Sequence, residues 1–155
     1  MNRVGILTFH SANNFGALLQ AVSLQKTIME RGNVECELID YEPEFIRKDY
    51  SIKDNHPKAI IKSALRIPDK IKRNLKFQAF REENIVCSKQ CLSENDFKNI
   101  CNSLDEIVVG SDQVWNYNLT KYDMHYFLPE IDASVKKVAY AASTGGADFS
   151  LKESN

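Results

Sequence analysis

Residues 4–25 read VGILTFHSANNFGALLQAVSLQ, and the two apolar spacings within this stretch decide the fold. The run Arg3–Phe9 is almost continuously apolar, which is typical of a strand buried on both faces of a parallel sheet. From Gly16 onward, apolar residues recur at helical spacing until Gly32, which is suited to ending a helix. A polar turn, His10–Phe15, separates the two. The stretch therefore predicts a strand, a loop and a helix.

Three further apolar runs predict the rest of the sheet. Glu35–Asp40 follows the first helix, and a strand after a helix of this length implies a right-handed crossover. Glu106–Val109 and Lys137–Ala142 are the third and fourth predicted strands. Before the third strand, Ser93 followed by Asp96 resembles a helix cap and predicts the start of a short helix. The predicted fold class is α/β, a Rossmann-like three-layer sandwich with a mainly parallel sheet. The length suits a single domain over residues 1–155.

A helical insertion is predicted around residues 57–84. Its pattern gives two helical stretches, Lys58–Ile71 and Leu75–Glu83, with an interruption near Pro68 because proline lacks the backbone donor that a helix interior needs. The insertion is rich in Lys and Arg. It is either a solvated helix face or a surface that rests on an anionic membrane, because apolar residues stand opposite its cations. These apolar residues are Ile60, Ile61, Ala64, Leu65 and Ile71.

Composition excludes several classes of protein. Hydrophobic residues make up 43% and charged residues 26%, and the net charge of -1 provides no general attraction to nucleic acid. No apolar run approaches the length needed to span a bilayer, so a cytoplasmic protein is expected. The cysteines form no CxxC pair and have no histidines at metal-ligand spacing, so we expect free thiols and no metal site. The cysteines are Cys36, Cys87, Cys91 and Cys101.

The loop after the first strand is a candidate binding site. Asn13 and Asn14 precede Gly16 at the start of the predicted helix, where free backbone N–H groups can bind an anion or a sugar hydroxyl. The alternative is that the asparagines cap the helix. His10 also follows the strand; it either binds substrate or is a hydrogen-bonded structural residue. The loop lacks a GxGxxG fingerprint, which disfavours a dinucleotide site.

The loop after the third strand carries a denser set of groups, GSDQVWN over residues 110–116. Trp115 can stack on the apolar face of a sugar ring, and Asp112 can act as a general base on an attacking hydroxyl. The alternatives are a core anchor for Trp115 and a helix cap for Asp112. The other predicted substrate-binding residues at these strand ends are Gly110, Ser111, Gln113, Asn116 and, after the fourth strand, Ser143.

Three segments in this order resemble the N-terminal half of the polysaccharide pyruvyl transferase family: the opening stretch, GSDQVWN and residues 137–146, KVAYAASTGG. The resemblance implies one half of a two-domain, glycosyltransferase-B-like architecture, with no counterpart here of the C-terminal domain. It implies transfer of pyruvate from phosphoenolpyruvate to two sugar hydroxyls as a ketal, with loss of phosphate and no cofactor. It also implies that the two polar loops line one side of the cleft.

The expected partners follow from this resemblance. They are phosphoenolpyruvate, an oligosaccharide or lipid-linked sugar of a bacterial cell-surface polysaccharide, and a C-terminal half or a second copy of the chain. Nucleic acid is not expected, and membrane association at the inner face is the second option for localisation. The alternative function is a catalytically inactive carbohydrate-binding module that needs a separate C-terminal partner. A shared sugar pocket requires Asn14 and Trp115 to lie at the same edge of the sheet.

Overall fold

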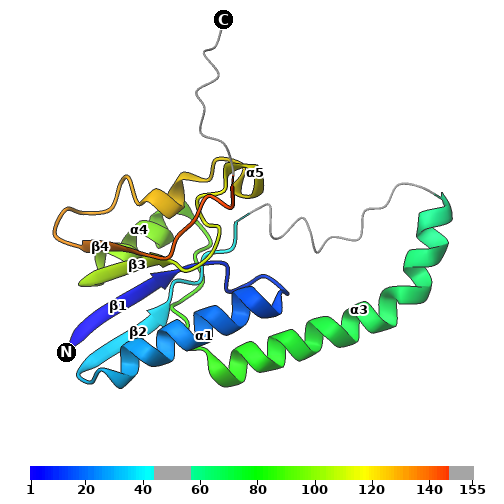
Figure 1. Cartoon of the computed structure of the whole chain (residues 1–155), viewed down its shortest axis with the longest axis horizontal. Helices are drawn as coiled ribbons and strands as arrows, with labels where there is room; N and C mark the ends of the chain where they lie inside the picture. Colours follow the sequence, from blue (N-terminus) through cyan, green and yellow to red (C-terminus); the bar gives the residue numbers. More distant parts are fainter. Residues whose placement is uncertain (44–56, 147–155) are drawn as a thin grey trace, which may run out of the picture.

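The computed structural model describes residues 1–43 and 57–146, and within these ranges all side chains except those of residues 57–67 and 70. The elements, labelled as in Figure 1, alternate between strands and helices along the chain. They are β1 (Asn2–Leu7), α1 (Phe15–Glu30), β2 (Val34–Leu38), α3 (Pro57–Asn84), α4 (Glu94–Asn102), β3 (Glu106–Gly110), α5 (Tyr117–Thr120), the 3-10 helix η1 (Met124–Phe127) and β4 (Lys136–Tyr140).

The four described strands form one parallel sheet in the order β2-β1-β3-β4. The predicted α/β fold with a mainly parallel sheet is therefore confirmed. β1 lies in the centre, as its apolar run predicts, and residues 4–7 are buried. β4 lies at the edge and is largely exposed, which its apolar composition did not predict.

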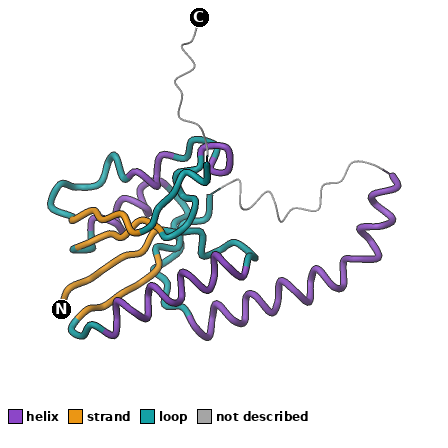
Figure 2. The backbone as a smooth tube through the Cα atoms, viewed as in Figure 1, coloured by secondary structure: helices purple, strands orange, loops and turns teal. Residues whose placement is uncertain are grey.

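Helices cover both faces of the sheet (Figures 1 and 2). On one face, Ala21 of α1 packs with Ile6 and Val108 in one hydrophobic cluster. On the other face, Phe97 of α4 joins Ile107 and the 3-10 helix in the larger cluster. Side chains alternate between the two faces along each strand, so neighbouring residues of β3 enter different clusters. This arrangement is the three-layer sandwich.

Helix α3 runs without interruption through Pro68, so the predicted break near this residue is wrong. A proline inside a helix removes one hydrogen bond and bends the helix, but it does not end the helix when the flanking turns are well held. Figure 1 shows a bend in the N-terminal half of α3. The C-terminal half is held by Phe77, whose side chain is buried. Within the described residues, no helix is long and apolar enough to cross a membrane.

Local caps fix where two helices begin. Asn14 Oδ1 accepts hydrogen bonds from the backbone N–H groups of Gly16 (2.8 Å) and Ala17 (3.3 Å) at the start of α1. Ser93 Oγ accepts from the backbone N–H of Asp96 (3.1 Å) at the start of α4, which confirms the predicted cap. These side chains satisfy donors that the first helical turn leaves without partners.

Candidate functional site

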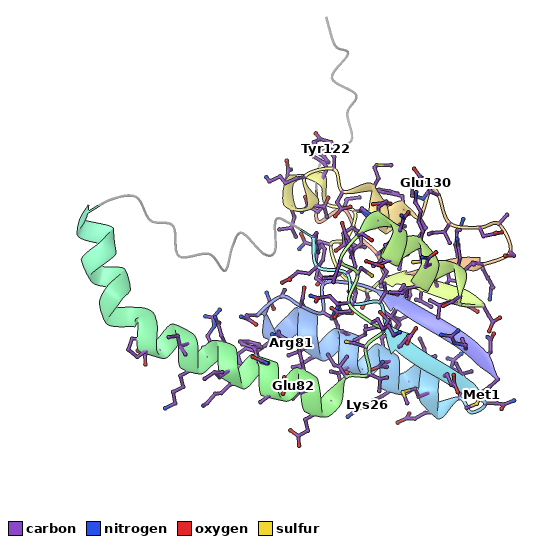
Figure 3. All side chains as sticks on the ribbon, turned by 180° about the vertical axis from the view of Figure 1, so that it is seen from behind. Met1, Lys26, Arg81, Glu82, Tyr122 and Glu130 are labelled. Carbon is purple, nitrogen blue, oxygen red and sulfur yellow. The ribbon has the colours of Figure 1, made fainter. Side chains whose placement is uncertain are left out.

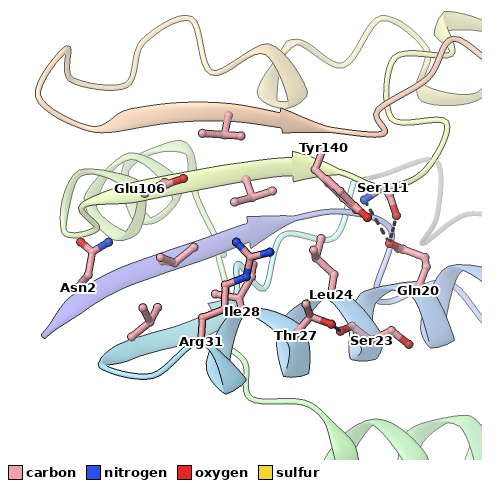
Figure 4. Close-up of a pocket in the computed structure, with 14 residues that line it drawn as sticks. Asn2, Gln20, Ser23, Leu24, Thr27, Ile28, Arg31, Glu106, Ser111 and Tyr140 are labelled. Atoms are coloured by element: carbon pink, nitrogen blue, oxygen red, sulfur yellow. Dashed lines mark hydrogen bonds between the residues drawn. The ribbon is translucent and has the colours of Figure 1, made fainter.

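Gln20 of α1 joins the carboxyl ends of β1 and β3. Its Nε2 donates to Thr8 Oγ1 (2.8 Å), and its Oε1 accepts from the backbone N–H (3.2 Å) and hydroxyl (3.0 Å) of Ser111. Figure 4 shows the two bonds to Ser111 as dashed lines. Gln20 was not among the predicted site residues, although it stands three residues after Ala17 and four before Leu24, a spacing that places it on the same apolar face of the helix.

The loops that follow β3 and β4 form one unit. The Ser143 N–H donates to Asp112 O (3.0 Å), and the Trp115 N–H donates to Ser143 O (3.1 Å). The two loops approach so closely at Gly145 that an added Cβ would lie 2.1 Å from Gln113 Oε1. A side chain at position 145 would therefore have to displace the Gln113 side chain, and the positive φ of +61° also favours glycine there. The structure brings together the predicted residues 110–116 and Ser143.

Asp112 is partly buried within this unit. Its Oδ1 accepts a hydrogen bond from the backbone N–H of Gln113 (2.7 Å). Among the residues that the structure describes, its Oδ2 has no hydrogen-bond partner. The helix that follows is capped by Asn116, whose Oδ1 accepts from the Asn118 N–H (3.1 Å), so the cap role considered for Asp112 belongs to Asn116. One oxygen fixed and one open is the arrangement that a general base needs.

Trp115 is anchored to the 3-10 helix. Its Nε1 donates to Tyr126 O (3.1 Å), and its ring stacks on Phe127 with centroids 5.8 Å apart and planes 11° apart. The side chain is partly buried against the larger hydrophobic cluster. These contacts support the core-anchor interpretation, and sugar stacking by Trp115 stays a prediction.

The asparagine loop is held by hydrogen bonds to helices α1 and α3. Asn14 caps α1, as one of the two interpretations predicted. Asn13 Nδ2 donates to Asn74 Oδ1 (2.9 Å), and Asn13 Oδ1 accepts from Arg81 Nη1 (3.0 Å). Arg73 Nη2 also donates to Asn13 O (3.4 Å). Helix α3 therefore places two cations beside the end of β1, which the sequence analysis missed because they lie about sixty residues away in the chain.

Both loops lie at the same edge of the sheet, because all four described strands are parallel. Ala12 of the asparagine loop and Trp115 pack against the same hydrophobic cluster. However, the contacts of Asn14 lead to α1, whereas those of Trp115 lead to the 3-10 helix. A pocket shared by the two side chains stays a prediction.

His10 is buried at the end of β1, with 2% of the residue exposed. Its Nδ1 lies 3.3 Å from Thr8 O, and its Nε2 lies 3.3 Å from Asp40 Oδ1. Burial alone lowers the pKa of His10, but hydrogen bonds with Asp40 and Cys87 outweigh it and raise the pKa to about 9. The imidazolium therefore joins the ends of β1 and β2, which is the structural role considered above.

This raised pKa predicts a pH-dependent stability. Because the folded pKa of about 9 exceeds the unfolded value of 6.5, the contribution of His10 is complete below the unfolded value and is lost as pH rises through the folded one. In urea unfolding, the free energy of unfolding of the wild type should fall by an amount on the order of 3 kcal/mol between about pH 6 and about pH 9.5. The variant His10→Gln should not show this fall. Equal drops in the wild type and the variant would contradict the assignment.

A profile of the polysaccharide pyruvyl transferase family matches residues 14–153. The chain belongs to this family. The matched range contains α1 with its cap, the GSDQVWN loop and Ser143, and it excludes His10 and Asn13. No curated protein and no solved structure matches the chain. Membership in this pyruvyl transferase family makes the chain a transferase-family protein with a polysaccharide-type acceptor.

A second titratable cluster lies beside the larger hydrophobic core. The Tyr41 hydroxyl donates to Asp123 Oδ2 (2.7 Å), and His125 lies between Asp123 Oδ1 (2.6 Å) and Glu94 Oε2 (2.8 Å). The hydrogen bond with Asp123 raises the pKa of His125, and the bond with Glu94 adds to it. Burial alone raises the pKa of Asp123, but hydrogen bonds with His125 and Tyr41 hold it below its usual value. The cluster therefore holds a stable ion pair.

A cavity of about 490 Å³ lies on the sheet face beside α1 (Figure 4). Among the predicted site residues, Ser111 lines this cavity. The cavity extends from Ser111 and Tyr140 to Asn2 and Glu106 at the amino ends of the strands. It is thus a groove along the sheet, whereas Asp112 belongs to the loops beyond the carboxyl ends.

Proposed function

We propose that this chain transfers pyruvate from phosphoenolpyruvate to a sugar of a bacterial cell-surface polysaccharide, forming a cyclic ketal. The observation that carries the proposal is Asp112, with one carboxylate oxygen fixed by the Gln113 N–H and the other open, in a loop joined to Ser143. Family membership supports the reaction class. The loops after β3 and β4 would hold the acceptor.

The chemistry requires one proton donor and one proton acceptor. The first sugar hydroxyl loses its proton and bonds to C2 of the enolpyruvyl group, while C3 gains a proton and becomes a methyl group. The bond between C2 and the phosphate oxygen then breaks, and phosphate leaves with the electron pair. The second hydroxyl bonds to C2 and loses its proton, which closes the ketal. The two protons that the hydroxyls lose over the whole reaction balance the one gained by C3 and the one taken up by the leaving phosphate. Asp112 is the proposed base for an acceptor hydroxyl.

The neighbours of Asp112 suit a sugar acceptor. Asn116 Nδ2 donates to Gln113 Oε1 (2.9 Å), so this pair of amides presents its remaining donors and acceptors near the base. Hydrogen bonds from such a pair can fix two hydroxyls of one sugar, as closure of the ketal ring requires. Arg73 and Arg81 provide positive charge at the same edge of the sheet, and the donor is an anion.

The test is acceptor-dependent loss of phosphate. The purified chain is incubated with phosphoenolpyruvate and a panel of p-nitrophenyl hexosides with free hydroxyls at positions 4 and 6. We expect phosphate release and a ketal product by mass spectrometry for at least one hexoside. The matched control carries a methyl group on one of these hydroxyls and should give no ketal. Sugar binding without consumption of phosphoenolpyruvate across the panel would contradict the proposal.

A further inference from the structure

Helix α3 carries an exposed apolar stripe, formed by Ile71 and Leu75. The two residues are one helical turn apart, and 52% of Ile71 and 59% of Leu75 is exposed. Lys72 and Lys76, also one turn apart and exposed, stand next to them on the helix surface. In the sequence, apolar residues continue the three- and four-residue spacing toward the start of the helix: Ile60, Ala64 and Ile67.

The opposite side of α3 is the side that packs on the domain. Phe77 is buried, and its ring lies 4.6 Å from that of Phe15 between centroids. Arg73 lies over the Phe77 ring and also bonds the asparagine loop. Figure 3 shows that the C-terminal part of α3, where Arg81 is labelled, lies along α1, while the remainder extends away from the domain. The stripe therefore faces away from the contact that fixes the helix.

The charge of this segment is strongly one-sided. Residues 57–77 contain one acid, Asp69, and the cations Lys58, Lys62, Arg66, Lys70, Lys72, Arg73 and Lys76. The whole chain has a net charge of -1, so this excess is local. A helix with an apolar stripe, low mean hydropathy and a basic polar face is the pattern that binds anionic lipid surfaces in the plane of the interface.

We propose that α3 docks on an anionic membrane surface, with Ile71 and Leu75 at the boundary between headgroups and acyl chains. Lys72 and Lys76 then lie over the lipid headgroups, as basic residues beside an apolar stripe do at membrane interfaces. The surface is separate from Asp112 and its loops, so this inference stands apart from the transfer reaction. It commits to lipid; a second copy of the chain or another protein is an alternative that the experiment excludes.

The experiment is co-sedimentation of the full chain with vesicles of neutral phosphatidylcholine, with or without about 30% anionic phosphatidylglycerol. We expect binding to the anionic vesicles alone, and a loss of affinity of about tenfold or more between about 0.1 M and about 0.5 M salt. Equal binding to neutral vesicles, or no binding to either, would overturn the proposal.

Matched variants distinguish lipid binding by the stripe from lipid binding by other exposed apolar residues. Ile71→Gln with Leu75→Gln should abolish binding, and Lys72→Gln should weaken it about fivefold. Leu92→Gln, at a residue that lies outside α3 and is 81% exposed, should bind like the wild type. Far-ultraviolet circular dichroism checks that each variant is folded. An equal loss in Leu92→Gln, or a stripe variant that loses self-association but keeps lipid binding, would overturn the proposal.

Discussion

Asp112→Asn is expected to lower the rate of pyruvyl transfer by about 100-fold or more, the usual contribution of a general base. Asparagine keeps an oxygen that can accept the hydrogen bond from the Gln113 N–H, now 2.7 Å from Asp112 Oδ1. The loop should therefore keep its shape, and the variant should lose only the ability to take a proton. Initial rates of acceptor-dependent phosphate release measure the effect, and the KM for the acceptor should change little because the loop persists.

Asp132→Asn is the matched control. Asp132 Oδ1 accepts hydrogen bonds from the backbone N–H (3.0 Å) and hydroxyl (3.0 Å) of Ser134, in the loop that enters β4. This loop lies at the amino ends of the strands, away from the proposed base. The control should retain wild-type rates. If Asp112→Asn stays within about threefold of this control, Asp112 is not the base, since general bases contribute far more.

Gly110→Ala is expected to lower the free energy of unfolding by about 3 kcal/mol or more. Gly110 ends β3 with φ of +114°, and an added Cβ would lie 2.2 Å from Tyr140 O. Gly110 and Tyr140 are also paired in the sheet, so the β4 backbone cannot retreat without breaking that pairing. Urea unfolding measures the loss. Transfer should fall as well, because Ser111 and Asp112 follow directly.

Gly32→Ala separates the cost of the positive φ from the cost of the close approach to Tyr140 O. Gly32 also has a positive φ, +77°, but nothing lies within 4 Å of an added Cβ. This control should lose only about 1 kcal/mol, from the backbone conformation alone. If the two alanine variants lose the same amount, the close approach to Tyr140 does not limit the turn.

The elements that local sequence determines were predictable. The apolar run of β1 indicated a buried central strand, and Ser93 with Asp96 indicated the start of α4, because a cap needs only residues within one turn. The break expected at Pro68 does not occur, because a missing backbone donor removes one hydrogen bond but does not by itself end a helix. The flanking turns of α3 supply the remaining hydrogen bonds, and the helix bends instead of ending.

The candidate site was predictable only in part. The loop of residues 110–116 meets Ser143 because parallel neighbouring strands end at one edge, which the strand order alone implies. The contact between Asn13 and Arg81 joins residues far apart in the chain, and no local periodicity encodes it. The burial of His10 likewise depends on Asp40 from another strand end.

The side-chain amide of Gln20 holds the ends of β1 and β3 together. An amide neither gains nor loses a proton over the range in which proteins are folded, so the links to Thr8 and Ser111 keep the same donors and acceptors throughout that range. The imidazolium of His10, by contrast, ionises. Alkaline solution should thus loosen the junction of the first two strands while the spacing between the first and third stays constant.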